Sequence, residues 1–423
     1  LWPRVLGSSR PGVFLEHLED QSLPVAWLVV PMAVVSALTG ILNARNQFAP
    51  PQWTHVIPTV SIVAAVLVLG TARGPAILAW GLLSGTSLQC LVLAMMVHRT
   101  GHRFSFRSGS PLEGAGQFLV LILPFLLLDI LGQANVLVDR GMAGSLVAGH
   151  LSVLYWSALG KDFLSSTLIA SVLWVLLPHF SDQVARGDLG SLRRSCSGVL
   201  KYAGVLMLPL TALLIVTGPS LLYDLSLQSL KPDDFRRLGV CLAAYSTGLF
   251  PELAGLALIQ ALLVLGRWKL LALIGLFGLF LPNLVFNVLL IGPFQEAGLA
   301  LSTGLTAWLL LAFSWIAVRQ TIGIATERDV VSSLLRSLAF SCVGGLSAWL
   351  IDAGLSHVVP RSVSGAAALG LGLGVFLLLA IGWPGHTDVR TALSLLRHRR
   401  RGESTENLSP GDKDGYDGGG PTS

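Results

Sequence analysis

Two adjacent charged residues, Lys161 and Asp162, stand in the long apolar segment LYWSALGKDFLSSTLIASVLWVLLPHF, residues 154–180. A helix over residues 150–178 would be about 44 Å long, which exceeds the hydrocarbon core of a bilayer, about 30 Å thick. The ammonium group of Lys161 could therefore extend to the membrane interface, or it could face an internal cavity and bind an anion. Because neighbouring helix residues point about 100° apart, we expect Lys161 and Asp162 to pair poorly with each other.

Glu252 lies in the middle of the apolar segment CLAAYSTGLFPELAGLALIQALLVLG, residues 241–266, next to Pro251, which we expect to kink the helix. A carboxylate at the centre of a bilayer is costly unless it faces water, protein or a cation, or is protonated. Two interpretations stay open. Glu252 is either a cavity-facing acid that binds a coupling proton or cation, or a neutral acid that is hydrogen-bonded between helices. We take it as the candidate ion-coupling residue.

Further polar residues lie within or at the ends of apolar segments. Asp139 and Arg140 end one such segment at the predicted external surface, either as a solvated pair or as a contact in a gate. Polar residues inside the spans can form hydrogen bonds between helices, worth about 0.6 kcal/mol each; these residues are Gln133, Asn135, Asn283 and Asn287. The candidate substrate-binding residues are Lys161, Arg140, Asn43, Gln133 and Asn287.

No motif typical of catalysis stands in a suitable context. In the sequence contexts where such motifs work, we find no Ser/His/Asp triad, Walker loop or nucleotide-binding glycine pattern. The four cysteines are far apart and mostly in or beside apolar runs, which indicates neither a disulfide framework nor a metal site. We therefore predict a protein that is not an enzyme and has no cofactor, metal or nucleic-acid partner. Transport could still be coupled to a monovalent cation, a proton or the membrane potential.

The elements that position these residues follow from the composition. Of 423 residues, 53% are hydrophobic and 12% charged, and the mean hydropathy is +0.70. Lipid offers no partners to backbone N–H and C=O groups, so a spanning segment of about 20 residues must form a helix. We predict an all-α, polytopic membrane protein with eleven transmembrane helices, near residues 23–43, 56–72, 75–97, 118–137, 152–178, 199–223, 240–265, 270–292, 297–318, 334–352 and 363–383.

Basic residues predict the orientation, because loops rich in Lys and Arg stay in the cytoplasm. The segments after the odd-numbered helices carry 19 of the 28 Lys and Arg residues, whereas the opposite side carries 8. The C-terminus is therefore predicted to be cytoplasmic and Leu1 external. The tail should be disordered after a basic cluster that contacts anionic phospholipids. This cluster contains Arg397, Arg399, Arg400 and Arg401.

Five segments resemble one family and occur in its order: GILNARNQFAPPQ (40–52), LGQANVLVDR (131–140), VLLPHFSDQVARGD (175–188), AAYSTGLF (243–250) and NVLLIGPFQEAGLALSTGL (287–305). The chain resembles the MurJ/MviN lipid II flippases of the multidrug/oligosaccharidyl-lipid/polysaccharide exporter superfamily. The resemblance implies a two-lobed transporter that moves an undecaprenyl-pyrophosphate-linked peptidoglycan precursor across the bacterial cytoplasmic membrane by alternating access. Such a headgroup cannot cross hydrocarbon unaided, because its desolvation costs too much.

On the family plan of fourteen helices, this chain would hold helices four to fourteen and lack the first three. A weak internal repeat, residues 75–101 against residues 296–322, agrees with two lobes. The expected organisation is an external N-terminal segment (1–21), a remnant of the first lobe (22–97), a cytoplasmic linker (98–117), a six-helix second lobe (118–322), two additional helices that form a candidate groove for the lipid tail (323–389) and the cytoplasmic tail (390–423).

The resemblance also shows departures. The family's cationic residues on its first two helices are not in this chain, and its arginine on the helix over residues 152–178 falls on Leu159. Lys161 lies about 200° round the helix from Leu159, so it is a poor substitute. A lipid II flippase is the leading hypothesis. The alternatives are a truncated or degenerate scaffold for cell-wall synthesis proteins, and an exporter of another polysaccharide-linked lipid or of cationic drugs. A cation-rich cavity favours the flippase, and an acidic cavity favours the drug exporter.

Overall fold

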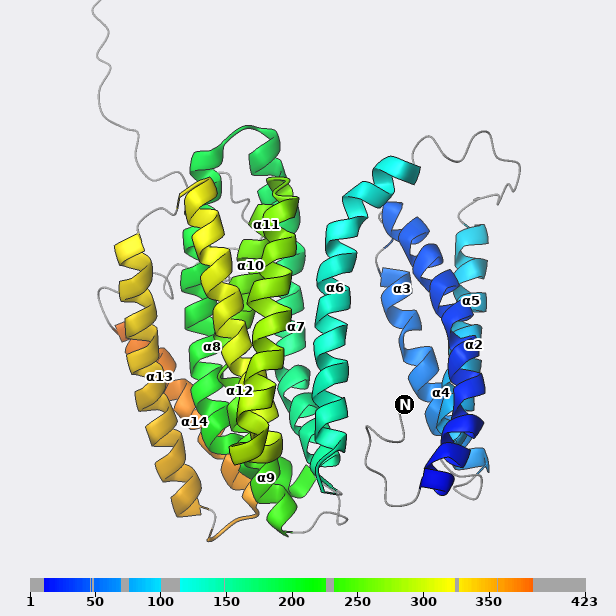
Figure 1. Cartoon of the computed structure of the whole chain (residues 1–423). Coiled ribbons are helices and arrows are strands. Elements are labelled where there is room, and N and C mark those ends of the chain that lie inside the picture. Colours follow the sequence, from blue (N-terminus) through cyan, green and yellow to red (C-terminus); the bar gives the residue numbers. More distant parts are fainter. Residues whose placement is uncertain are drawn as a thin grey trace, which may run out of the picture. The chain divides into compact units, whose positions relative to one another are not determined.

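A computed structural model of the chain describes residues 11–45, 47, 49–69, 76–99, 115–147, 149–225, 232–323, 327–355 and 357–382. The regular structure within these ranges is helical (Figure 1), as the sequence predicted. The chain divides into two compact units, Leu1–Phe118 and Leu119–Ser423. Each unit has a hydrophobic core of its own.

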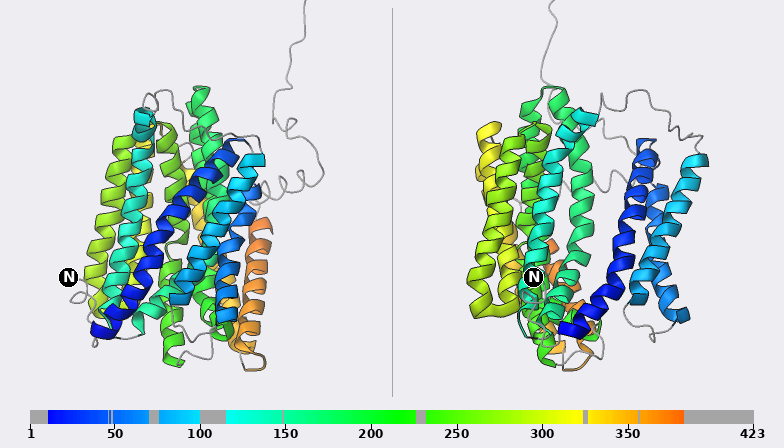
Figure 2. Two further views of the ribbon diagram at one scale, coloured as in Figure 1. Left: turned by 90° about the vertical axis from the view of Figure 1, so that its right-hand side faces the viewer. Right: turned by 45° about the vertical axis from the view of Figure 1, so that its right-hand side comes forward.

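The first unit contains α2 (Pro11–Ala44), α3 (Ala49–Thr54), α4 (Val56–Leu69) and α5 (Ala76–Arg99). α5 packs on both α2 and α4, and Figure 2 shows these three helices side by side in blue. The contact with α4 requires glycine, because a Cβ atom on Gly85 would lie only 2.6 Å from the Cα atom of Pro58. α2 begins earlier than the predicted residue 23, so residues 11–21 are helical as well.

The second unit contains α7 (His150–Ala185), α8 (Leu189–Leu225), α9 (Pro232–Ser246), α10 (Leu249–Val264), α11 (Trp268–Leu273), the π-helix η2 (Ile274–Phe280), α12 (Leu281–Thr321), α13 (Glu327–Leu355) and α14 (Arg361–Gly382). It also contains most of α6 (Ala115–Gly144), which begins just before the division.

Asp188 caps α8 by accepting hydrogen bonds from the hydroxyl and the backbone N–H of Ser191, and these bonds lower the pKa of Asp188.

The number of membrane helices agrees with the prediction. Nine stretches of the described residues are long and apolar enough to cross a membrane. One of them, Trp268–Thr321, holds two predicted spans, because α12 has a non-helical residue, Gln295, with φ 52° and ψ −129°. A Cβ atom on Gly278 would lie 3.6 Å from the Cα atom of Leu310, so the chain after Gln295 returns beside the chain before it. With α6, which matches predicted residues 118–137, about eleven helices are confirmed.

α10 is the central helix of the second unit. It packs on α7, α8 and α12. Pro251 was predicted to kink one continuous helix, and the structure instead breaks the helix between Ser246 and Leu249. Proline has no N–H for the carbonyl four residues earlier, that of Thr247. The indole N–H of Trp308 donates to this carbonyl at 3.1 Å, so a neighbouring helix satisfies it.

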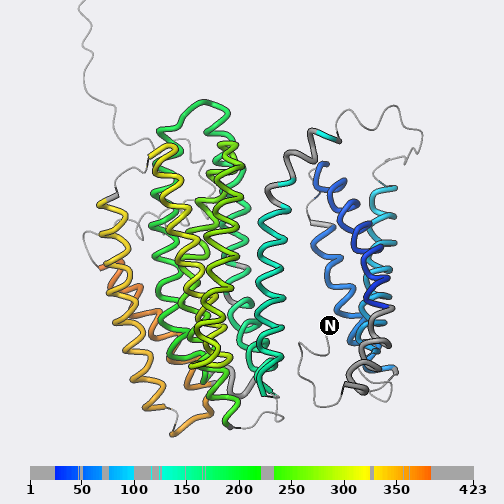
Figure 3. The backbone as a smooth tube through the Cα atoms, in the orientation of Figure 1, coloured from blue at the N-terminus to red at the C-terminus, as the bar shows by residue number. Residues whose placement is uncertain are grey.

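α13 and α14 pack on each other and on α8, and Figure 3 traces them in gold and orange beside green α8. Their close approach uses glycines, because a Cβ atom on Gly344 would lie 2.9 Å from the carbonyl oxygen of Gly372. The carboxylate of Asp352 on α13 joins all three helices. It accepts hydrogen bonds of 2.7 Å from both Ser220 and Ser364. The expected linker, residues 98–117, and the basic tail lie largely or wholly outside the described residues.

Candidate functional site

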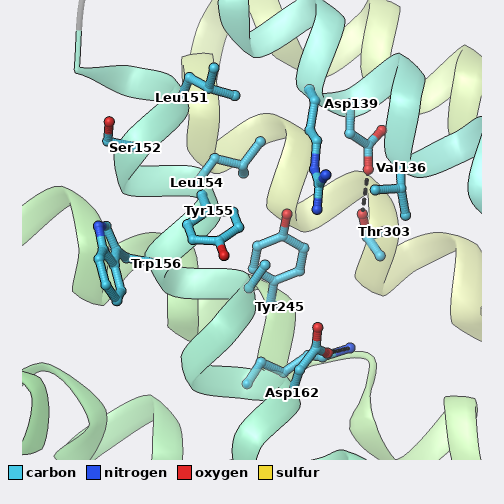
Figure 4. Close-up of a pocket in the computed structure, with 13 residues that line it drawn as sticks. Val136, Asp139, Leu151, Ser152, Leu154, Tyr155, Trp156, Asp162, Tyr245 and Thr303 are labelled. Carbon is cyan, nitrogen blue, oxygen red and sulfur yellow. Dashed lines mark hydrogen bonds and ion pairs between the residues drawn. The ribbon is translucent and has the colours of Figure 1, made fainter. Parts of the chain in front are cut away.

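A cavity of about 440 Å³ lies in the second unit among residues of α6, α7, α9 and α12. Six of its α7 residues follow a spacing of three and four, which places them on one face of that helix: Leu151, Leu154, Tyr155, Ala158, Lys161 and Asp162. Figure 4 shows Asp139 and Thr303 at one end, Asp162 at the other, and the rings of Tyr155 and Tyr245 between them. The full lining is Val136, Asp139, Arg140, Leu151, Ser152, Leu154, Tyr155, Trp156, Ala158, Lys161, Asp162, Tyr245 and Thr303.

Lys161 is a buried member of this lining, so the interpretation as a lysine that extends to the membrane interface is wrong. Its ammonium Nζ lies 3.0 Å from Oδ1 of Asp162 and 3.2 Å from Oε2 of Glu252. The expectation that Lys161 and Asp162 would pair poorly is also wrong. The Cβ directions of the two residues diverge, but the flexible four-carbon stem of lysine lets the ammonium group reach its neighbour.

Glu252 lies in the first turn of α10 and forms an ion pair with Lys161 of α7. The two residues are 91 positions apart in the sequence, and sequence reasoning did not connect them. Glu252 also lines a second cavity, of about 570 Å³, with Asp162, Ser165, Ser166, Gln260 and an apolar wall that includes Trp174. The group formed by Lys161, Asp162 and Glu252 therefore lies between two cavities, with Asp162 lining both.

Arg140 is the exposed cation of the first cavity. Its guanidinium carbon lies 5.9 Å from the centre of the Tyr155 ring, a cation–π contact. Within the part of the chain that the structure describes, Arg140 forms no ion pair with a carboxylate. Asp139, in contrast, is buried and turned to α12. The two adjacent residues therefore do not form the solvated pair that the sequence allowed.

A buried network of polar side chains holds Asp139 in place. The side-chain amide of Asn287 donates to Oδ1 of Asp139 at 2.5 Å and to Oδ1 of Asn283 at 2.9 Å. The hydroxyl of Thr303 donates to Oδ2 of Asp139 at 3.3 Å, and that of Ser302 donates to Asn287. Asn287 thus bonds across helices and does not line the cavity.

The other two candidate substrate-binding residues lie elsewhere. Gln133 is exposed on α6, and it is not among the residues that line the first cavity. Asn43 is half-buried near the end of α2, in the first unit. Of the five candidates, the structure therefore brings together Arg140 and Lys161 in one cavity.

A second group of charged and polar residues, in which His150 and Glu296 are buried and Arg237 is exposed, was missed from the sequence. His150 at the start of α7 contacts Glu296 of α12 through Nδ1, and Nη1 of Arg237 on α9 lies 3.1 Å from Nε2. A guanidinium only donates hydrogen bonds, so Nε2 accepts, and the ring proton stands on Nδ1 and is donated to Glu296. The three residues come from predicted external loops. In the sequence, the one indication that they could meet was that all three were predicted on the same side of the membrane.

The described residues contain no group of three or more His, Cys, Asp or Glu side chains arranged to hold a metal ion. The chemistry that the first cavity offers is instead electrostatic. A guanidinium, an ammonium, two carboxylates and three aromatic side chains line one space. The charges of this lining balance, so it is neither cation-rich nor acidic. The guanidinium of Arg140 forms no ion pair among the described residues, so it is the group that can bind an anionic ligand.

Comparisons with known proteins agree with one another. The family model described as "Lipid II flippase MurJ" matches residues 20–363. A protein of Vibrio cholerae serotype O1, named "Probable lipid II flippase MurJ", is 22% identical over 368 residues, which cover 85% of this chain and 69% of that protein. A protein of the same name from Buchnera aphidicola subsp. Baizongia pistaciae is 24% identical over 307 residues, which cover 71% of this chain and 60% of that protein.

A solved structure titled "Lipid II flippase MurJ, inward closed conformation" has the same fold. Its TM-score is 0.70 at 17% sequence identity, and the match covers 93% of this chain and 77% of that one. Because the family model matches most of its length, the chain belongs to the lipid II flippase MurJ family of multi-pass membrane proteins.

Proposed function

We propose that this protein moves lipid II, an undecaprenyl-pyrophosphate-linked peptidoglycan precursor, across the bacterial cytoplasmic membrane by alternating access. Membership of the family supports this function, as do the names of the relatives. The observation that carries the proposal is Arg140, a cation in a cavity with no carboxylate partner among the described residues.

The diphosphate of such a substrate needs cationic donors. A guanidinium presents two parallel N–H groups to a phosphate, and the pair is stronger where water is partly excluded. Arg140 is free to act in this way, whereas Lys161 is already shared between two carboxylates. Arg140 is therefore the first diphosphate contact, and Lys161 is the second. Tyr155 and Trp156 offer aromatic surface on the same wall for the uncharged parts of the headgroup.

The orientation and the lipid contacts belong to the same proposal. The charge asymmetry of the loops supports a cytoplasmic C-terminus. The paired helices α13 and α14 are the candidate groove for the prenyl tail of the lipid. Arg397, Arg399, Arg400 and Arg401, outside the described residues, would contact anionic phospholipids, and cell-wall synthesis proteins are the expected protein partners.

The test uses cells that are depleted of their own lipid II flippase and express this protein from its complete reading frame. Wild-type protein should restore the access of an external lipid II-degrading enzyme to its substrate. Arg140→Gln should reduce this access by at least about tenfold, because losing one charged contact to a phosphate costs about 1.5–3 kcal/mol.

Arg186→Gln is the matched control. Arg186 is also an exposed arginine of the second unit, but it pairs with Asp182 at the end of α7 and lies outside both cavities. This variant should keep wild-type access at equal expression. If wild-type protein fails to expose lipid II, or if Arg140→Gln and Arg186→Gln behave alike, the proposed function or its site is wrong.

A further inference from the structure

The ion pair of Lys161 and Glu252 separates two cavities that differ in character. The first contains Arg140, and its polar lining includes Ser152 and Thr303. The second is walled largely by apolar side chains, and its charged residues are Asp162 and Glu252. Lys161 faces the first cavity, Glu252 faces the second, and the two side chains meet at 3.2 Å.

The charge of this group decides what the first cavity can bind. Lys161, Asp162 and Glu252 together carry one net negative charge when all are ionised. An anion that approaches Lys161 therefore meets an ammonium group that two carboxylates already neutralise. If Glu252 binds a proton or another cation, the group becomes neutral. Lys161 then has only Asp162 as a partner, and the Asp162 side chain is 59% exposed and screened by water.

We propose that Glu252 is a binding site for a monovalent cation, a proton in the simplest case, and that its occupation frees Lys161 to bind an anionic headgroup in the first cavity. The inference rests on the proposed function for the identity of that anion. Because coupling between two sites is reciprocal, the anion must strengthen the binding of the cation by the same factor. Cation and anionic substrate would thus bind together, although they enter different cavities.

The second cavity has the features that a small cation needs. Glu252 has one-third of its side chain exposed, so it can be reached. Gln260 lies on the same face of α10, about two turns further on. Its side-chain oxygen has no hydrogen-bond partner among the described residues, but it lies about 12 Å along the helix from Glu252, so it does not contact an ion that Glu252 holds. The hydroxyls of Ser165 and Ser166 supply further oxygen atoms.

The charged groups around Glu252 show which cation its neutralisation affects. On α7, it faces Lys161 and Asp162. α8, α11 and α12 also pack on α10, and within the described residues none of them forms an ion pair with Glu252. Arg140 and Asp139 of α6 lie in the first cavity, on the far side of Lys161. Neutralisation of Glu252 therefore acts on one cation, Lys161.

The experiment measures binding of a farnesyl diphosphate sugar to the purified complete protein in detergent. This probe is a diphosphate diester, so its charge is constant between about pH 5 and about pH 8. One arm varies pH at constant sodium, and the other replaces choline by sodium at constant pH. Wild-type protein should bind the probe on the order of tenfold more tightly at low pH or at high sodium, and the arm that responds identifies the cation.

Three variants test the assignment. Glu252→Gln should bind tightly under all conditions, because the amide keeps the shape of the side chain but carries no charge. Lys161→Met should bind weakly under all conditions, through Arg140 alone. Asp182→Asn is the matched control, since Asp182 is an exposed carboxylate of α7 that pairs with Arg186 outside both cavities, and it should keep the wild-type response.

A Glu252→Gln protein that retains the wild-type response to pH and sodium would overturn the inference, and so would a wild-type protein that shows no response. The proposed function fails separately, if no protein binds the probe under any condition. Thermal unfolding of each variant establishes that it is folded. Glu252→Gln leaves Lys161 its contact with Asp162, so it should unfold near the wild-type temperature.

Discussion

Three groups of charged side chains in the described residues have polar partners, although not every member is fully buried. Lys161 meets two carboxylates, Asp352 accepts two serine hydroxyls, and His150 links Glu296 to Arg237. A charged or polar group in lipid requires such partners, because water is not there to replace them. The sequence predicted that Glu252 would need water, protein or a cation. It could not name Lys161, because pairing across 91 residues depends on how α7 and α10 pack.

The His150 contact gives a prediction about stability. His150→Leu removes both hydrogen-bonding nitrogens and leaves the buried carboxylate of Glu296 without the proton that His150 donates. The free energy of unfolding should fall by about 3 kcal/mol. The double variant His150→Leu/Glu296→Leu removes the stranded charge as well, so it should recover most of this loss. Denaturant unfolding in detergent, followed by intrinsic tryptophan fluorescence, provides the measurement. A double variant no more stable than His150→Leu would show that the charge is not the cause.

At the scale of elements, the turn at which the chain reverses direction within α12 depends on the conformation of a few backbone positions. Gln295 has φ 52° and ψ −129°, a conformation that only glycine adopts without strain. Gly298 lies against the first limb, because a Cβ atom there would be 2.2 Å from the carbonyl oxygen of Leu290. The sequence predicted two helices here from Pro293 and the apolar pattern. It gave no sign that a glutamine would take the strained position.

This geometry predicts opposite effects of glycine substitutions. Gln295→Gly should raise the free energy of unfolding by about 1 kcal/mol, because it relieves the strained φ. Gly298→Ala should lower it by about 1–3 kcal/mol, because the methyl group overlaps backbone. Gly292→Ala is the control: a Cβ there would have no neighbour within 4 Å, so stability should not fall. Thermal unfolding in detergent can rank the three. Equal effects of Gly298→Ala and Gly292→Ala would contradict the observed turn.

Element prediction succeeded where one physical requirement dominates. Spans such as α5 and α14 follow from apolar length alone, because a helix is the structure that satisfies its own backbone in lipid. The break before Pro251 was only partly predicted. The sequence indicated a kink, but the separation of α9 from α10 depends on the indole of Trp308 from another helix. A hydrogen-bond donor from another helix is brought into place by tertiary packing, so the residues around Pro251 do not indicate it.

At the scale of the whole molecule, orientation in the membrane links the charge pattern to the direction of transport. Positive loops stay inside, and the segments after the odd-numbered helices carry 19 of the 28 basic residues. In a protein with its native cysteines replaced, single cysteines at Phe104 and Gly190 should therefore resist an impermeant thiol reagent in intact cells. One at Leu230 should react. Labelling of the first two positions and protection of the third would reverse the proposed orientation.

The proposed transport requires lipid II to enter the cavity of the second unit. Trp156 lines this cavity on α7, whereas Trp349, on α13, is similarly exposed but lies outside it. A photo-reactive amino acid at each position can be illuminated in cells that contain lipid II. Covalent capture of lipid II is expected at position 156, with little or none at position 349. Equal capture at both positions, or none at 156 in a protein that still exposes lipid II outside the cell, would show that the substrate does not pass through this cavity.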